Sequence, residues 1–182
     1  MIVSISPYRS DRNIGKANND CISRFDNDDW IVLTDHDACW LLPESGTHIE
    51  MIIKEHGNDY DLIGCITNRL GSTPQLYNGV FDSVCNAYDC YEDALDAWEK
   101  YGTTIKPIDL IAGVCMIFKV STWERVGGFK ENTRMADVEF CKSVKRSGGK
   151  IGLAKGLYIM HNYRLTETEM KKAKTNYKHL VK

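Results

Sequence analysis

Residues 30–40 read Trp-Ile-Val-Leu-Thr-Asp-His-Asp-Ala-Cys-Trp, and the fold is decided by this stretch. Its first five residues have high strand propensity, which predicts a buried strand over 30–34. Two aspartates follow at the end of that strand, one residue apart. Because side chains alternate faces along an extended chain, we expect Asp35 and Asp37 to point one way and His36 the other. Paired carboxylates at a strand end suit a hard divalent cation, although aspartate is also common in plain surface turns.

Strands and helices alternate on both sides of this stretch. Apolar runs predict strands at 2–5, 61–66, 111–120, 151–154 and 157–160, and helical spacing predicts helices after Asn13, from Pro43 to Gly57, and over 91–101, 121–126 and 136–147. This pattern predicts an α/β fold with a mainly parallel sheet and function at the carboxyl ends of its strands. We expect a single domain over 1–182, with 165–182 forming a basic terminal helix. The stretch 67–83 shows no period, and a loop of this length indicates a functional segment.

Composition excludes several classes of function. The chain has 182 residues and a formal net charge of -2, which argues against a broad electrostatic grip on nucleic acid. Its 7 cysteines form no CxxC pair, so a zinc knuckle has little support and reduced thiols are expected. The longest apolar run, 110–118, is too short to span a bilayer. No basic leader precedes the first strand, so we expect a cytoplasmic protein without a transmembrane segment.

Three ordered stretches carry a family resemblance. The first is Asn13-Ile14-Gly15-Lys16-Ala17 with Asn19, which leads to the aspartate stretch; the second is residues 123–129, Trp-Glu-Arg-Val-Gly-Gly-Phe; the third is residues 137–141, Asp-Val-Glu-Phe-Cys, running on to the Gly-Gly-Lys-Ile at 148–151. In order and spacing, over most of residues 2–164, they resemble the GT-A glycosyltransferases of the family-2-like type, in a compact form like that of phage and small microbial enzymes. Two features depart from that family: its extra strand and helix after the first strand are missing, and its Glu-Asp pair is Ala136-Asp137 here.

The resemblance implies a metal-dependent sugar transfer. The donor would be a nucleoside diphosphate sugar, with a UDP-sugar expected, and the cofactor Mn²⁺ or Mg²⁺. The metal ligands would be Asp37, Asp35 (directly, through water, or at the ribose) and His161. The catalytic base would be Asp137, in the first turn of a helix whose dipole favours negative charge. An attacking hydroxyl needs such a base, and the departing diphosphate needs charge stabilisation. Helix charge complementarity for Asp137 and a carbonyl-bonded strand-end histidine for His161 are the plain structural alternatives.

Further residues are candidates for substrate contacts. The donor set is Pro7, Tyr8, Arg9, Asn13, Lys16, Asn19, Asp35 and Arg164, and the acceptor set is Trp40, Arg69 and Gly113. Solvated surface cations are the commoner interpretation of Lys16 and Arg164, and a core position is the commoner one for Trp40. The acceptor class is open between a saccharide, a protein, a lipid and a modified nucleic acid.

Two other functions remain as alternatives. A nucleotidyltransferase shares nucleotide-binding architecture and metal aspartates, but it usually has a Gly-rich loop after the first strand, and residues 6–11 contain no glycine. A non-catalytic sugar- or nucleotide-binding module would not need Asp37 and Asp137 together, although Ala136 leaves room for one.

Overall fold

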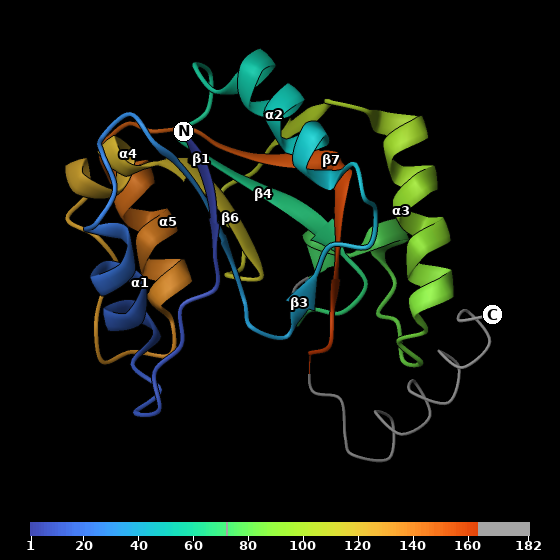
Figure 1. Cartoon of the computed structure of the whole chain (residues 1–182), viewed down its shortest axis with the longest axis horizontal. Helices are drawn as coiled ribbons and strands as arrows, with labels where there is room; N and C mark the ends of the chain where they lie inside the picture. Colours follow the sequence, from blue (N-terminus) through green and yellow to red (C-terminus); the bar gives the residue numbers. More distant parts are fainter. Residues whose placement is uncertain (72, 164–182) are drawn as a thin grey trace.

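The computed structural model describes residues 1–71 and 73–163, and in them a central sheet of seven strands (Figure 1). The predicted basic helix over 165–182 and Arg164 lie outside the described residues. Six strands lie side by side in the order β1 (Ile2–Ile5), β2 (Trp30–Thr34), β6 (Cys115–Lys119), β4 (Leu62–Thr67), β7 (Ile151–His161) and β3 (Ala38–Cys39). The seventh, β5 (Ile105–Pro107), also pairs with β7. The expected α/β class is confirmed.

The sheet is mixed, where a mainly parallel one was expected. β1 with β2 and β4 with β7 are parallel pairs, whereas β6 runs antiparallel between β2 and β4, and β3 and β5 run antiparallel to β7. The apolar run of β6 is buried on both faces of the sheet. Such a run has the same sequence pattern in either direction, so periodicity alone does not reveal its orientation.

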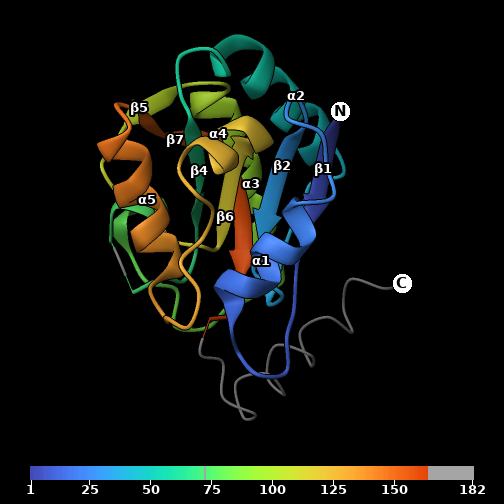
Figure 2. The same cartoon turned by 90° about the vertical axis from the view of Figure 1, so that its left-hand side faces the viewer.

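Helices cover both faces of the sheet. On one face, α1 (Ile14–Ile22), α4 (Val120–Arg125) and α5 (Ala136–Arg146) pack against the odd-numbered residues of β2, Ile31 and Leu33, as Figure 2 shows from that side. On the other face, α2 (Ser45–His56) packs against Trp30 and Val32, and α3 (Ala87–Tyr101) packs against β7. None of the helices in the described part of the chain combines the length and apolarity needed to cross a membrane.

β7 is one long strand, although its sequence predicts two short ones. Its register against β4 shifts between the pairs Cys65–Ala154 and Ile66–Tyr158, which leaves residues 155–157 as an irregularity inside the strand. At Gly156 an added Cβ would lie 2.1 Å from the carbonyl oxygen of Gly102, so only glycine permits this close approach. The interruption in the apolar pattern is therefore a bulge, and the strand continues to His161.

The segment before β6 is a loop instead of the expected start of a strand. The expected strand 111–120 is confined to Cys115–Lys119. Residues 110–114 bend away because Ala112 N donates to Gln75 Oε1 at 2.7 Å, while Gln75 Nε2 donates to the Cys65 carbonyl at 3.1 Å. The stretch 67–83 contains two single 3₁₀ turns, Thr73–Gln75 and Tyr77–Gly79. The first of these turns carries buried Gln75, so this stretch positions the loop before β6.

Candidate metal and donor site

Asp35 and Asp37 lie in a turn at the carboxyl end of β2. Asp35 N donates to the Val114 carbonyl at 3.2 Å, and Ala38 N donates back to the Asp35 carbonyl at 3.2 Å, which closes the turn before β3. We expected strand alternation to direct the two carboxylates to one side. That reason is wrong, because the strand ends at Thr34 and both aspartates lie in the turn that follows. The turn directs both of them toward β7. The His36 ring lies instead edge-on to Tyr8, with ring centroids 5.9 Å apart.

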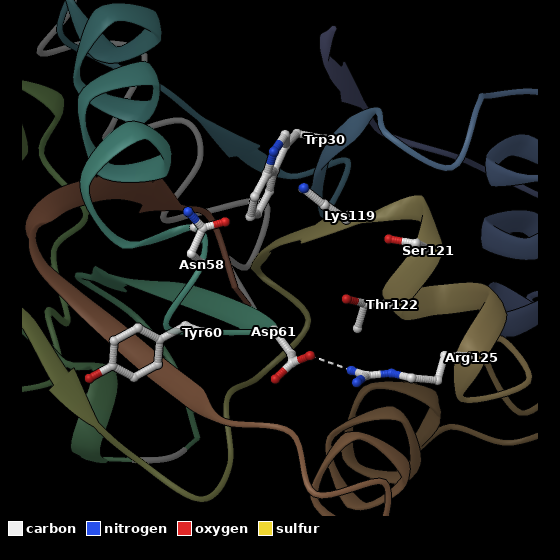
Figure 3. Close-up of a pocket in the computed structure, with 9 residues that line it drawn as sticks. Trp30, Asn58, Tyr60, Asp61, Lys119, Ser121, Thr122 and Arg125 are labelled. Carbon is white, nitrogen blue, oxygen red and sulfur yellow. Dashed lines mark hydrogen bonds and ion pairs between the residues drawn. The ribbon is translucent and has the colours of Figure 1, made fainter.

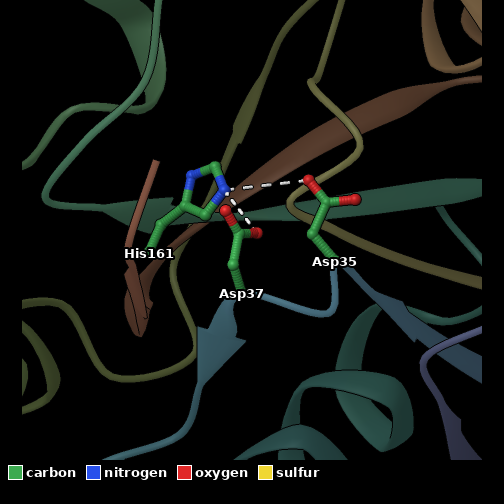
Figure 4. Close-up of side chains that lie close together, drawn as sticks. All are labelled: Asp35, Asp37 and His161. Atoms are coloured by element: carbon green, nitrogen blue, oxygen red, sulfur yellow. Dashed lines mark hydrogen bonds and ion pairs between the residues drawn. The ribbon is translucent and has the colours of Figure 1, made fainter. Parts of the chain in front are cut away.

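His161, at the end of β7, meets both carboxylates. Its Nε2 lies 3.1 Å from Asp37 Oδ1 and 3.8 Å from Asp35 Oδ2, and Figure 4 shows the three side chains pointing toward one another. Its Nδ1 lies 2.8 Å from the Arg69 carbonyl oxygen. A carbonyl oxygen only accepts, so Nδ1 carries the proton in that contact. In neutral His161 the Nε2 lone pair therefore faces two carboxylates, an arrangement that is favourable only with a cation there, either a proton or a metal ion.

Backbone contacts fix this histidine on both sides. His161 is paired with Ala38 across the β3–β7 ladder, and His161 N donates to Asn68 Oδ1 at 2.8 Å. On the aspartate side, Asn162 donates to the Asp37 carbonyl from its backbone N at 2.9 Å and from Nδ2 at 3.1 Å. The side chain of His161 is only 3% exposed. The three groups are therefore held in place by the sheet rather than by one another.

The pKa values of the three groups in the cluster are shifted in different directions. Burial raises the pKa of Asp35, although 39% of its side chain stays exposed, and the charges of Asp37 and Asp137 raise this pKa further against the opposing effect of His161. The hydrogen bond to His161 holds the pKa of Asp37 below its ordinary value. Burial lowers the pKa of His161, but the hydrogen bond to Asp37 and the nearby carboxylates outweigh it, so the net shift is upward. The three pKa shifts arise from burial and from the close approach of two carboxylates to one imidazole.

The spacing of the three groups fits one divalent ion. One ligand atom from each residue lies within 4.8 Å of the other two. Metal–oxygen bonds of about 2.1 Å allow ligand atoms up to roughly 4.2 Å apart, and both distances from His161 Nε2 to a carboxylate fall below that limit. A histidine ligand commonly donates its other ring N–H to a backbone carbonyl, as Nδ1 does to Arg69 here. Carboxylates are typical ligands of Mg²⁺, Ca²⁺ and Mn²⁺, and imidazole is a typical ligand of transition metals, so the set fits a divalent cation without selecting one.

Asp137 is tied to the same corner through the loop before β6. In the first turn of α5, its Oδ2 accepts from Gly113 N at 3.0 Å and its Oδ1 accepts from Val138 N at 2.8 Å. The neighbouring Val114 carbonyl accepts from Asp35 N, so two consecutive residues link the two acids. A Cβ on Gly113 would lie 3.4 Å from the Asp137 Cβ, at the short limit of ordinary van der Waals contact. The charge of Asp137 is close enough to raise the pKa of Asp35.

The two predicted donor cations near the first strand are paired with neighbouring aspartates. Arg9 pairs with Asp11 and Asp20, and Lys16 also pairs with Asp20. The Arg9 guanidinium is the main cause that lowers the pKa of Asp11 to about 2. Tyr8, which follows Pro7 and is 72% exposed, extends this group toward His36 and the aspartate turn.

Two predicted donor residues have structural partners. Asn13 caps α1 by accepting from Lys16 N at 3.2 Å, and it also bonds Asn132. Asn19 Oδ1 accepts from Phe129 N at 2.8 Å and from Trp123 Nε1 at 3.0 Å, while its Nδ2 donates to the Phe129 carbonyl. The asparagine and the Trp-to-Phe stretch that carry the sequence resemblance are thus joined by hydrogen bonds.

The predicted acceptor residues have different environments in the structure. Arg69 is buried, and its side chain donates from Nε to the Tyr163 carbonyl and from Nη1 to the Asp82 carbonyl. Gly113 holds Asp137, and Trp40 packs partly buried against the core beneath α2. Sequence reasoning missed Asn68 and Gln75, which position His161 and the loop before β6. Both are buried polar residues inside an aperiodic stretch, and no local pattern distinguishes such residues from loop residues in solvent.

The fold has known counterparts. The chain is similar to the solved structure of the mannosyltransferase PcManGT from Pyrobaculum calidifontis in complex with GDP-Man and Mn²⁺, with a TM-score of 0.54 and 17% sequence identity. The match covers 82% of this chain and 36% of that one, so the chain spans about a third of the mannosyltransferase. Comparison with protein-family models and with curated proteins finds no match. The chain therefore has the GT-A fold, as its sequence motifs indicate, and a likeness at this identity establishes the fold alone.

Proposed function

We propose that this protein is a metal-dependent glycosyltransferase of the hexosyltransferase type (EC 2.4), which moves a sugar from a nucleoside diphosphate sugar to an acceptor hydroxyl. The observation that carries the proposal is the convergence of Asp35, Asp37 and His161 at the carboxyl end of β2, in a GT-A fold. With Nδ1 of His161 committed to the Arg69 carbonyl, its Nε2 and the two carboxylates form a ligand set for one divalent cation.

The residues divide the chemistry between them. Asp35, Asp37 and His161 would hold Mn²⁺ or Mg²⁺, which when bound supplies charge stabilisation to a departing diphosphate. Asp137 takes the proton of the attacking hydroxyl. Its two hydrogen bonds from backbone N–H groups fix the carboxylate and leave each oxygen a further lone pair that can accept. A base that acts directly on the acceptor implies inversion at the sugar carbon.

We assign the donor and the acceptor to different residues around the cluster. Tyr8 and Arg9, beyond β1, are the nearest candidates for the nucleoside, and a UDP-sugar is the first expectation. The similar mannosyltransferase was solved with GDP-Man, so GDP-mannose belongs in the same test. The acceptor side is assigned to Arg69, Trp40 and Gly113, and its class stays open between saccharide, protein, lipid and modified nucleic acid.

A single assay separates this proposal from its alternatives. The protein is incubated with each of a panel of UDP-, GDP- and dTDP-sugars, with Mn²⁺ or with EDTA, and released nucleoside diphosphate is measured. A glycosyltransferase releases nucleoside diphosphate from one donor in Mn²⁺, if only by slow hydrolysis without acceptor. Pyrophosphate release from a nucleoside triphosphate and a sugar phosphate would identify a nucleotidyltransferase. Saturable donor binding with no release, in the presence of varied acceptors, would identify a binding module.

A further inference from the structure

A polar hollow lies at the end of the sheet opposite the metal cluster. Trp30, the first residue of β2, forms one wall, and the segment 57–61 and the start of α4 form the others (Figure 3). The hollow has a volume of about 290 Å³. Five residue steps along β2 separate Trp30 from Asp35, roughly 17 Å at about 3.4 Å per residue, so this hollow is not part of the donor site.

Polar groups without protein partners face this hollow. Thr122 is only 7% exposed, yet its hydroxyl has no hydrogen-bond partner within residues 1–71 and 73–163. The side chains of Ser121 and Asn58 are exposed and also make no hydrogen bond within the described chain, and Figure 3 shows all three directed toward the middle of the hollow. Among the described residues, the buried side-chain atoms without a hydrogen-bond partner are His56 Nε2 and Tyr158 Oη, so the Thr122 hydroxyl is instead open to the hollow, where water or a ligand can bond it.

One cation in the hollow also lacks an acidic partner. Lys119 Nζ lies 5.6 Å from the centroid of the Trp30 ring and makes no ion pair with any described residue. Arg125, on the floor, is already paired with Asp61, whose other oxygen accepts from Lys150 N at 2.9 Å. The charged groups that line the hollow therefore sum to a single positive charge, which matches a monoanion better than a phosphate dianion.

Backbone contacts anchor the walls of the hollow. Val120 N donates to the Asp29 carbonyl and Ser121 N to the Asn27 carbonyl, both at 3.0 Å, which fixes the start of α4 beside β2. Gly57 lets the indole approach closely, since a Cβ there would lie 2.7 Å from the Trp30 ring. The polar groups are thus presented by backbone that is anchored independently of any ligand.

We propose that this hollow binds one sugar residue that carries a carboxylate, such as a uronic acid unit. Its carboxylate pairs with Lys119, its hydroxyls bond Thr122, Ser121 and Asn58, and its apolar ring face lies toward Trp30. The volume of about 290 Å³ lies just below the usual range of ligand pockets, about 300–1,000 Å³, so a single ring fits better than an oligomer. The proposal rests on this hollow alone and not on the glycosyltransferase activity.

The test is a titration of the isotope-labelled full chain in EDTA, followed through the indole N–H resonance of Trp30. Sodium glucuronate is the probe, glucose matches it without the carboxylate, and acetate matches the anion without the ring. We expect glucuronate to shift the Trp30 resonance and to bind on the order of 10-fold more tightly than glucose, from one charge-assisted contact. Acetate should shift it weakly. No shift with glucuronate, or an equal response to acetate, would overturn the proposal.

Two variants assign the contacts. Lys119→Met should remove the preference for glucuronate over glucose, whereas Lys54→Met, an exposed lysine on α2, should leave it unchanged. Thr122→Val keeps the shape and removes the hydroxyl, so it should weaken binding of both sugars. The same spectra report whether each variant is folded. Unaltered glucuronate affinity in a folded Lys119→Met or Thr122→Val protein would contradict the proposed site.

Discussion

At His161, two requirements meet in one side chain. The protein must hold the ring, and the ring must present Nε2 to the carboxylates. The Arg69 carbonyl, which contacts Nδ1, and the β3–β7 pairing hold the residue and leave Nε2 available. A histidine bonded only for structural reasons would not need two acids at its other nitrogen. The plain structural alternative and the metal-ligand role are therefore compatible here, since the carbonyl contact prepares the ligand.

Replacing His161 by Ala should raise the Mn²⁺ concentration for half-maximal activity by about 10-fold or more, on the scale expected for disturbing a metal site. The reason is the loss of one of three ligand atoms while Asp35 and Asp37 remain. His48→Ala is the matched control, because the His48 ring stacks on Trp98 and does not contact the cluster. If metal dependence is unchanged while thermal stability drops, His161 has only a structural role.

Asp137→Asn tests the proposed base. Asparagine keeps the size of the side chain and one of the two backbone contacts, because it has a single acceptor oxygen, and it removes the ability to take a proton. We expect kcat to fall by about 10²-fold or more while donor affinity changes little. Rapid-mixing turnover and equilibrium donor titration provide the two quantities. A variant with near-normal turnover would remove Asp137 from the mechanism and favour a retaining route.

At the scale of elements, the site depends on a loop and a strand that sequence patterns describe poorly. The β2 strand, its two aspartates and the start of α5 are local features, and each was found where the sequence predicts it. The meeting of Asp35 and His161 is not local, because it requires β7 to continue through its bulge and to pair with β3. The direction of β6 and the two hydrogen bonds by which Gln75 joins Cys65 to Ala112 also depend on residues far apart in the sequence. No periodicity in the chain indicates either of them.

Gln75→Leu tests how much the hydrogen bonds of Gln75 to Cys65 and Ala112 contribute to stability. The leucine leaves the Ala112 N–H and one acceptor position of Cys65 without their buried partner, which should lower the free energy of unfolding by about 2 kcal/mol. Activity should fall as well, since residues 113–114 hold Asp137 and Asp35. Urea denaturation measures the first effect, with exposed Glu50→Gln as the control. A change within about 0.5 kcal/mol, as for an ordinary surface substitution, would contradict this contribution.

For the molecule as a whole, the proposed metal site would couple folding to proton and metal binding. Without metal, the raised pKa of His161 means that its contribution to stability is fully present below about pH 6.5 and is lost as pH rises through the folded-state pKa. The raised pKa of Asp35 acts in the same direction, because ionising this group disfavours the folded state. The lowered pKa of Asp37 contributes stability at neutral pH, and this is lost only in strong acid.

Metal should therefore stabilise the protein more at higher pH. A divalent cation replaces the proton between Nε2 and the carboxylates, so its binding tightens as that proton is lost. We expect Tm in EDTA to fall between about pH 6 and pH 8, and the increase in Tm caused by Mn²⁺ to grow over the same interval. Thermal melts with and without Mn²⁺ at both pH values provide the measurement. An Mn²⁺ effect that is constant with pH would separate the cation from His161.

The most direct test of the central claim compares nucleoside diphosphate release by the wild-type chain and by Asp37→Asn, each in Mn²⁺ and in EDTA. Asparagine keeps the shape of the ligand and removes its charge, so release in Mn²⁺ should fall by more than about 10²-fold, the scale of a lost electrostatic stabiliser. Wild-type activity should vanish in EDTA and return with added Mn²⁺. Full activity of the wild-type chain in EDTA, or of a folded Asp37→Asn chain in Mn²⁺, would contradict a metal-dependent transfer at this site.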